Sequence, residues 1–206
     1  MARGKLITIE GLDGAGKSTL AGGLLTELRA RGLRAELLRE PGGVHAAELI
    51  RDLVKDPSSR ISARTEALLY AAARAQLVEE ALEPLLRDGT WVLLDRFVDS
   101  SLTYQGAGRE LGLEPVLAIN GFATAGLEPD RTLLLRVDPA VGLARSRGRG
   151  ALDRLEREPD DFFSRVAHAY DELARAEPAR IRVIDAGQPA DAVLAAAIKA
   201  LADLLV

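Results

Sequence analysis

Short apolar runs alternate along this chain with longer segments rich in helix-forming residues. Short apolar runs that end at turn signals are typical of strands buried in a parallel sheet. Glycine and proline mark many of the boundaries between the two kinds of segment. The pattern predicts five strands, at residues 6–10, 34–39, 91–94, 132–137 and 181–184. It predicts helices at residues 17–31, 46–55, 62–86, 98–104, 115–125, 139–146, 160–176 and 189–205.

The alternation of strands and helices indicates an α/β fold with one five-stranded parallel sheet and helices on both of its faces. A chain of 206 residues is long enough for one such domain, and no linker or repeat divides it. We therefore expect a single domain over residues 1–206. Ligands of such sheets bind beyond the carboxyl ends of the strands, and the loops with chemically interesting residues follow strands.

The first of these loops carries the segment Gly11–Ser18, which has the spacing GxxxxGK[ST]. In this phosphate-binding loop (P-loop), glycines let backbone N–H groups surround an anion, Lys17 reaches the β- and γ-phosphates, and Ser18 binds Mg²⁺. The helix that follows presents its positive end to the phosphates. The alternative is an ordinary glycine-rich turn, but a strand before and a helix after favour a nucleotide site.

The amino-acid composition argues against several other classes of function. The net charge of −4 argues against a general nucleic-acid binder. The absence of cysteine excludes disulfides and thiolate chemistry, and His45 and His168 lack the spacing of metal ligands. We expect no membrane segment and no signal peptide, and therefore a cytoplasmic protein.

The positions of the lysine and arginine residues indicate which kind of molecule could accept a phosphoryl group from the bound nucleotide. A guanine-binding switch protein needs an [NT]KxD segment, and none of the four lysines lies in one. An acceptor that is already a phosphate monoester, with a second pKa of ~6, needs cations rather than a base. Arg39, Arg74 and Arg96 lie near strand ends, and a further arginine cluster covers residues 145–157. Part of that cluster can be an ordinary solvated surface.

Several segments together carry a family resemblance. They are the P-loop with its flanks at residues 10–19, Arg-Glu-Pro-Gly-Gly at 39–43, residues 66–76, residues 95–106, the arginine-rich segment, and Asp-Ala-Gly-Gln-Pro at 185–189. With them, the chain resembles the thymidylate kinases over nearly its whole length. The resemblance implies a P-loop kinase that uses ATP and Mg²⁺ to phosphorylate dTMP to dTDP, as a homodimer.

The resemblance also implies roles at the acceptor site. Asp13 would accept a hydrogen bond from the 3′-hydroxyl of dTMP, and Arg96 would bind its phosphate. Arg74 would donate to a thymine carbonyl, Tyr104 would disfavour ribose, and Tyr70 would stack on the base where the family usually has Phe. The remaining substrate-binding residues that it implies are Arg39, Gln76, Ser100 and Gln105. Val44 stands where the family usually has Thr.

A second set of implied residues concerns ATP, the metal and catalysis. The ATP-binding residues would be Gly11, Asp13, Gly14, Ala15, Gly16, Lys17, Ser18, Thr19, Arg145 and Gln188. Ser18 and Asp95 would hold Mg²⁺, partly through water. The catalytic residues would be Asp13, Lys17, Arg96 and Arg149. Gly14 together with Arg149 resembles the members whose catalytic arginine lies in a lid, here about residues 145–158, which closes over ATP.

Two alternatives stay open at this point. The chain could be another nucleoside monophosphate kinase, or a P-loop ATPase that acts as a regulatory module. An ATPase would hydrolyse ATP without a monophosphate, whereas a kinase would be nearly silent until its acceptor is added.

Overall fold

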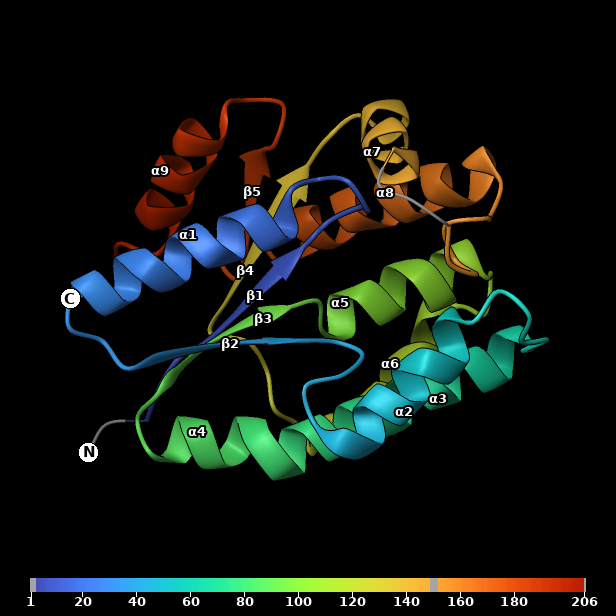
Figure 1. Cartoon of the computed structure of the whole chain (residues 1–206), viewed down its shortest axis with the longest axis horizontal. Coiled ribbons are helices and arrows are strands. Elements are labelled where there is room, and N and C mark those ends of the chain that lie inside the picture. Colours follow the sequence, from blue (N-terminus) through green and yellow to red (C-terminus); the bar gives the residue numbers. More distant parts are fainter. Residues whose placement is uncertain (1–2, 149–151, 206) are drawn as a thin grey trace.

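A computed structural model of the chain describes residues 3–148 and 152–205. Its centre is one sheet of five strands that all pair in parallel, in the order β2-β3-β1-β4-β5 (Figure 1). The strands are β1 (Leu6–Glu10), β2 (Ala35–Arg39), β3 (Trp91–Asp95), β4 (Arg131–Arg136) and β5 (Ile181–Asp185). The predicted α/β fold with five parallel strands is therefore confirmed.

Helices cover both faces of this sheet, and α1 and α9 lie together on one of them (Figure 1). The long run from α3 to α4 and the helices α5 and α8 pack on the opposite face. The helices are α1 (Lys17–Ala30), α2 (His45–Lys55), α3 (Ala63–Leu77), η1 (Val78–Leu82), α4 (Glu83–Arg87), α5 (Val98–Ser101), η2 (Leu102–Gly108), α6 (Leu113–Thr124), α7 (Pro139–Arg147), α8 (Asp160–Ala176) and α9 (Ala190–Ala200).

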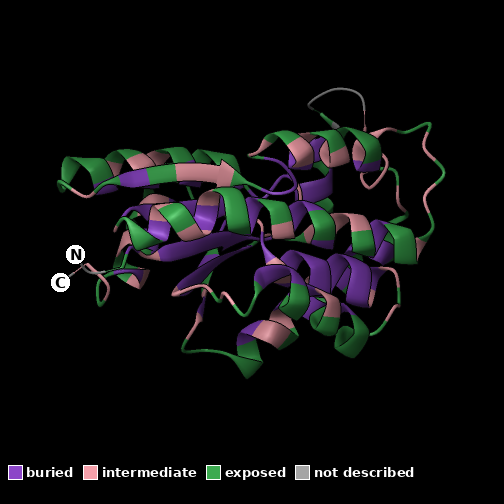
Figure 2. Cartoon of the chain, turned by 90° about the horizontal axis from the view of Figure 1, so that it is seen from below, coloured by how far each residue is buried: buried purple, intermediate pink, exposed green. Residues whose placement is uncertain are grey.

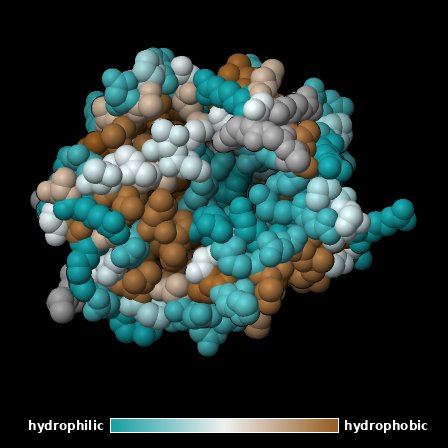
Figure 3. All heavy atoms as spheres, viewed as in Figure 1, coloured by the Kyte–Doolittle hydropathy of each residue, from teal (hydrophilic) through white to brown (hydrophobic). Residues whose placement is uncertain are grey.

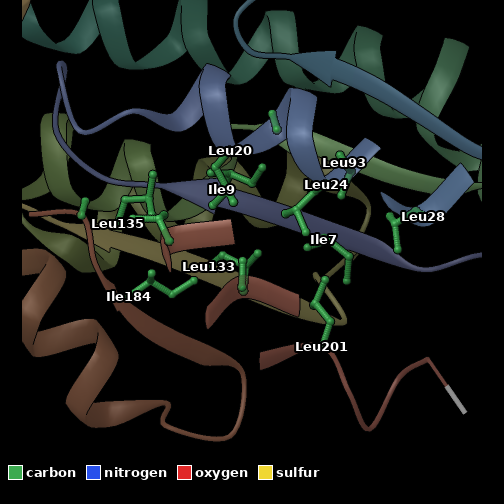
Figure 4. Close-up of a cluster of buried hydrophobic side chains, with 14 of the residues drawn as sticks. Ile7, Ile9, Leu20, Leu24, Leu28, Leu93, Leu133, Leu135, Ile184 and Leu201 are labelled. Carbon is green, nitrogen blue, oxygen red and sulfur yellow. The ribbon is translucent and has the colours of Figure 1, made fainter. Parts of the chain in front are cut away.

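The alternation of side chains along the strands supplies two hydrophobic layers. Ile7 and Ile9 of β1 pack with Leu24 of α1 on one face (Figure 4). Leu6 points to the other face, where it packs with the α3–α4 run. The strands at the centre of the sheet are accordingly buried on both sides (Figure 2). Each such fully buried aliphatic side chain stabilises the fold by about 1.5–3 kcal/mol.

The structure corrects several predicted helix ends, and two of these corrections have a clear local cause. Ser62 lies outside α3 as its N-cap, and its side chain accepts a hydrogen bond from the amide of Thr65. The terminal helix ends at Ala200 instead of residue 205. Beyond it, the amides of Leu201 and Leu204 bond to carbonyls only three residues back, and both side chains pack against the core. Tight turns that bury these leucines replace the expected helical turn.

Two helical runs also contain wider turns that the sequence does not indicate. The predicted helix over residues 62–86 is interrupted by the π-helical η1, and the helix that begins at Val98 continues as the π-helical η2 to Gly108. Such wider turns occur frequently at functional sites.

Across the two described ranges, no helix is both long and apolar enough to cross a membrane.

Candidate active site

The P-loop connects β1 to α1, and two of its glycines hold left-handed backbone conformations, with φ of 80° at Gly14 and 94° at Gly16. Glycine adopts these angles without the steric cost that a side chain imposes. Lys17 Nζ donates to the carbonyl oxygens of Gly11 (3.1 Å) and Leu12 (3.0 Å). Burial, helped by the nearby Arg96 charge, lowers the pKa of Lys17 to about 8. The loop thus holds a partly desolvated ammonium group, which an incoming anion stabilises.

Helix α7 closes the back of this loop. A Cβ atom built at Gly14 would lie 2.0 Å from the carbonyl oxygen of Gly142, and one at Gly142 would lie 2.9 Å from the oxygen of Asp13. The loop and the helix are therefore in backbone contact, and position 14 has no room for a side chain. A catalytic arginine cannot be supplied from there. The predicted lid arginine, Arg149, lies outside the described residues.

A candidate metal site lies where α1 meets the end of β3. Ser18 Oγ donates to Asp95 Oδ2 over 3.3 Å, while Asp95 Oδ1 is buried and has no hydrogen-bond partner among the described residues. An unpartnered carboxylate oxygen beside a hydroxyl suits a hard cation, since Mg²⁺ takes one or two protein oxygens and completes its shell with water and phosphate. The residues present therefore fit Mg²⁺.

Arg96 lies at the centre of the site, directly after β3. Its backbone φ is 73°, a left-handed conformation that costs an arginine roughly 1–2 kcal/mol. Its guanidinium donates to Asp13 Oδ1 (2.8 Å), Ser100 Oγ (3.0 Å) and Tyr104 Oη (3.2 Å). Burial would raise the pKa of Asp13, but the charges of Arg96 and Lys17 hold that pKa below its usual range. Asp13 is thus an ionised acceptor in the floor of the site.

Glu10, at the end of β1, supports the turn that carries Arg96. Its carboxylate accepts hydrogen bonds from the amide of Phe97 (2.7 Å) and the hydroxyls of Ser100 (2.6 Å) and Tyr170 (2.7 Å). The side chain is fully buried, and burial, together with the charge of Asp99, raises the pKa of Glu10. The sequence shows Glu10 only as a flank of the P-loop, so this supporting role is not predictable from it.

A cavity of about 370 Å³ adjoins the P-loop and Arg96. Figure 3 shows hydrophilic side chains around a hollow to the right of the centre of the molecule. The site residues expected from the sequence that line it are Asp13, Gly14, Gly16, Lys17, Ser18, Thr19, Arg39, Tyr70, Asp95, Arg96, Ser100, Tyr104 and Gln105. Lining residues that sequence reasoning did not single out are Glu40, Pro41, Arg51, Lys55, Ser101, Asp153, Leu155 and Glu156. The structure thus joins the phosphate loop and the expected acceptor residues around one space.

Six expected site residues among those described do not line this cavity. Two of them, Gly11 and Ala15, belong to the P-loop itself. Arg74 is buried and donates to Glu40, Ser101, Asn120 and the carbonyl of Phe97. The other three lie at the surface. Gln76 donates to Glu80, Arg145 lies 3.5 Å from the carbonyl of Ala186, and Gln188 donates to Asp185.

Glu40 and Arg74 form a buried ion pair in which one carboxylate oxygen of Glu40 has no partner among the described residues. Arg74 Nε and Nη2 lie 2.8 and 2.5 Å from Glu40 Oε2, while Glu40 Oε1 is buried with no partner among the described residues. Burial raises the pKa of Glu40 to about 7 despite the neighbouring Arg74 charge. Glu40 and Ser101 line the cavity, so Arg74, which is bonded to both, lies directly behind the cavity wall.

The fold and the site define a P-loop kinase with an acceptor cavity beside its phosphate loop. The sequence model of the thymidylate kinase family matches residues 9–197. The chain is 48% identical to the thymidylate kinase of Lactobacillus delbrueckii subsp. bulgaricus, over 96% of this chain and 95% of that protein. It is also 48% identical to those of Alkalilimnicola ehrlichii (98% and 94% covered) and Deinococcus radiodurans (93% and 93% covered). The chain belongs to the thymidylate kinase family.

Proposed function

We propose that this enzyme transfers the γ-phosphoryl group of ATP to the phosphate of dTMP, giving ADP and dTDP for dTTP synthesis. The observation that carries the proposal is the single cavity that joins Lys17 and Ser18 of the P-loop to Arg96, Tyr70 and Tyr104. In-line transfer requires donor and acceptor phosphates to be held end to end, and a shared cavity meets that requirement. The family membership supports the choice of ATP and dTMP.

In the acceptor half, Arg96 binds the dTMP phosphate and Asp13 accepts a hydrogen bond from the 3′-hydroxyl. The Arg96 guanidinium already faces the cavity with Asp13 and Ser100 as partners, so an incoming phosphate meets a charge that is held in place. Tyr70 stacks on thymine and Tyr104 crowds the 2′ position, with Arg39, Ser100 and Gln105 around the nucleotide. Gln76 and Arg74 do not line the cavity and act from behind the residues that do. Arg74 reaches a thymine carbonyl only by giving up one of its present acceptors.

In the donor half, the loop residues Gly11–Thr19 surround the ATP phosphates, and Arg145 and Gln188 bind the nucleoside. The proximity of Arg145 to the carbonyl of Ala186 supports this last assignment, because it brings α7 beside the β5–α9 loop. Ser18 and Asp95 hold Mg²⁺, which neutralises charge on the β- and γ-phosphates when it is bound.

During transfer, Lys17 and Arg96 stabilise the charge on the phosphoryl oxygens. Arg149 is proposed to add a third cation from the lid, about residues 145–158. Position 14 cannot supply that cation, because its Cβ would collide with the backbone of α7. Lid residues Asp153, Leu155 and Glu156 line the cavity, which supports a role of this segment in excluding water.

Two further properties complete the proposal. We place the enzyme in the cytoplasm, where its two nucleotide substrates are available. We also propose a homodimer, formed through the apolar faces of α2, α3 and α6. The exposed hydrophobic residues on these helices are Leu49, Leu53, Leu68, Leu113, Leu117 and Phe122, and Phe122 is 91% exposed. An exposed apolar face that spans adjacent helices is typical of an interface between protein chains.

A coupled ADP-release assay across a panel of nucleoside monophosphates tests the proposed substrate. We expect dTMP to exceed dCMP and dGMP in kcat/KM by as much as ~10⁴, because a site that hydrogen-bonds a group rejects analogues that lack it. ATP turnover should be nearly absent without a monophosphate. Comparable kcat/KM for dTMP and dGMP would indicate a different monophosphate kinase, and full turnover with ATP alone would indicate an ATPase.

A further inference from the structure

The part of the lid that follows the undescribed residues, 152–158, lies against the helices that form the acceptor cavity. Arg154 makes three of these contacts. Its amide donates to the carbonyl of Lys55 (3.2 Å), its Nε donates to the carbonyl of Val54 (2.9 Å), and its Nη2 lies 2.5 Å from Glu66 Oε2. Lys55 Nζ also pairs with Asp153 over 2.9 Å. The segment is thus attached both to the end of α2 and to the first turn of α3.

Glu66 accepts hydrogen bonds from other side chains besides Arg154. Its carboxylate is fully buried and accepts from Gln105 Nε2 (2.9 Å), Arg109 Nε (3.2 Å) and Arg109 Nη2 (3.0 Å). Arg109 Nη1 in turn lies 2.6 Å from Glu158 Oε1, at the far end of the lid segment. One buried carboxylate therefore connects two points of the lid with the η2 helix.

The position of Glu66 relates these contacts to the acceptor. Tyr70 lies one turn further along α3, and both Tyr70 and Gln105 line the cavity. A nucleotide that packs on Tyr70 and contacts Gln105 therefore restrains the same two elements that hold Glu66. Ordering those elements in advance lowers the cost of attaching the lid, which gives positive coupling between acceptor and lid.

The two cations that pair with Glu66 explain why Arg154 can dissociate from it while the site stays folded. Glu66 has two guanidinium partners, so its buried carboxylate keeps Arg109 when Arg154 moves away. Removing the last cation from a buried carboxylate would be strongly destabilising, and Arg109 spares Glu66 that loss. Arg154 can therefore leave and return with the lid without unfolding the site.

We propose that Arg154 and Glu66 form a latch that holds the lid over the monophosphate, with Arg154 as a positioning residue that touches neither nucleotide. The inference rests on the proposed acceptor site. Bound dTMP strengthens the latch and keeps water from the γ-phosphate, whereas without dTMP the lid opens more often. Phosphoryl transfer to water is then suppressed in the ternary complex by closure.

The variant Arg154→Met tests the latch, because it keeps the length of the stem and removes only the guanidinium. We expect the Kd and KM for dTMP to rise about tenfold with little change in the KM for ATP. We also expect ADP to be released in excess of dTDP when both substrates are present, whereas wild type should form the two in equal amounts. A merely structural role would not change that ratio.

Arg157→Met is the matched control, since Arg157 lies in the same segment, is exposed and, within the described residues, donates only to the carbonyl of Leu152. It should behave as wild type. Glu66→Gln should reproduce the excess ADP, and the double variant Glu66→Gln/Arg154→Met should be no worse than the poorer single variant. A melting temperature within a few degrees of wild type verifies that Arg154→Met is folded.

Three results would overturn the latch. The first is a Kd for dTMP and an ADP-to-dTDP ratio in Arg154→Met equal to those of wild type. The second is fully additive effects of the two substitutions. The third is a large loss of kcat with unchanged binding of dTMP, which would make Arg154 a residue in contact with the transferring group. Failure of the wild-type enzyme to phosphorylate dTMP would instead refute the proposed function, so the two failures are distinguishable.

Discussion

Arg96 combines a strained backbone with three side-chain partners. Several elements of the fold therefore hold its guanidinium in one position. The amide of Arg96 bonds to the carbonyl of Ile9 in the neighbouring strand, and the carboxylate of Glu10 holds the turn that follows. Its guanidinium also lies over the ring of Tyr104, 4.9 Å from the ring centre. Strained residues that persist in a fold are held by their surroundings and cluster at functional sites.

At this scale we predict that Arg96→Ala raises the KM for dTMP strongly and leaves the KM for ATP nearly unchanged. Loss of a charge-assisted contact to the acceptor phosphate should cost about 2–4 kcal/mol. Steady-state kinetics with each substrate varied in turn measure the effect. Arg136→Ala, which removes an exposed cation paired with Asp171, is the control and should be neutral. An unchanged KM and kcat for dTMP would reduce Arg96 to a structural ion-pair partner.

The side-chain partners of Arg74 cannot be predicted from the pattern of residues along the chain. The sequence indicates an arginine near the acceptor, but it does not indicate that Glu40, Ser101 and Asn120 already take up the guanidinium. Those partners are 34, 27 and 46 residues away. The contact of Arg74 with thymine stays a prediction.

At the scale of elements, strands β1 and β4 are joined at their first residues by Asp130. Its carboxylate accepts from the amide of Leu6 (2.9 Å), from Lys5 Nζ (3.0 Å) and from Arg3 Nη1 (3.1 Å). Burial opposes the ionisation of Asp130, but the Leu6 amide and the charges of Lys5 and Arg3 outweigh it and lower its pKa below the ordinary 3.8. The ionised form is therefore the one that stabilises the sheet.

We predict that Asp130→Asn lowers the free energy of unfolding at pH 7 by about 1–2 kcal/mol, because it removes the charge but keeps an acceptor for Leu6. Since the folded pKa is lowered, this stability is present above pH ~4 and is lost as pH falls through the folded value. Urea unfolding of both proteins between pH 7 and pH 3 should show the difference shrinking towards acid. Asp88→Asn, which disrupts an exposed pair with Arg34, should show little difference at any pH. A constant difference over the whole range would contradict the role of the charge.

The elements themselves are largely predictable from the sequence, and the exceptions have local causes. The strands are recognisable because short apolar runs between turn signals are typical of strands that a parallel sheet buries on both faces. The π-helical turns at Val78–Leu82 and Leu102–Gly108 leave no clear sequence signal. Glu66 lies in a segment that resembles the family, but its role depends on Arg109 and Arg154, 43 and 88 residues away. The sequence predicts which loops meet at the edge of the sheet, but not which buried carboxylates hold them together.

At the scale of the molecule, the apolar residues of α2, α3 and α6 remain uncovered in the single chain. Figure 3 shows hydrophobic side chains at the lower right of the molecule, where α2 and α3 lie in the same view of Figure 1. The same helices carry acceptor-site residues on their inner sides, since Arg51 of α2 and Tyr70 of α3 line the cavity. An interface on the outer sides would therefore support the wall of the cavity.

We predict that the enzyme is a dimer of the 22.0-kDa chain and that Phe122→Asp or Leu68→Asp converts it to a monomer. These residues lie on different helices and are 91% and 57% exposed in the single chain, so the substitutions should disturb little except an interface. A charge buried without a partner in an apolar interface is strongly unfavourable. Sedimentation equilibrium measures the mass of each variant. Val183→Asp introduces the same charge at an exposed apolar residue of β5 and should leave the dimer intact.

The monomers should also bind dTMP less tightly, because Leu68 lies two residues before Tyr70 on α3 and loses the partner chain behind it. We expect a higher KM for dTMP and a lower melting temperature, with the KM for ATP nearly unchanged, since α1 and the P-loop lie away from this face. A monomeric wild-type enzyme would refute the homodimer. Two variants that remain dimeric would show that the chains associate through another surface. Monomers with an unchanged KM for dTMP would show that the cavity wall is rigid without a partner.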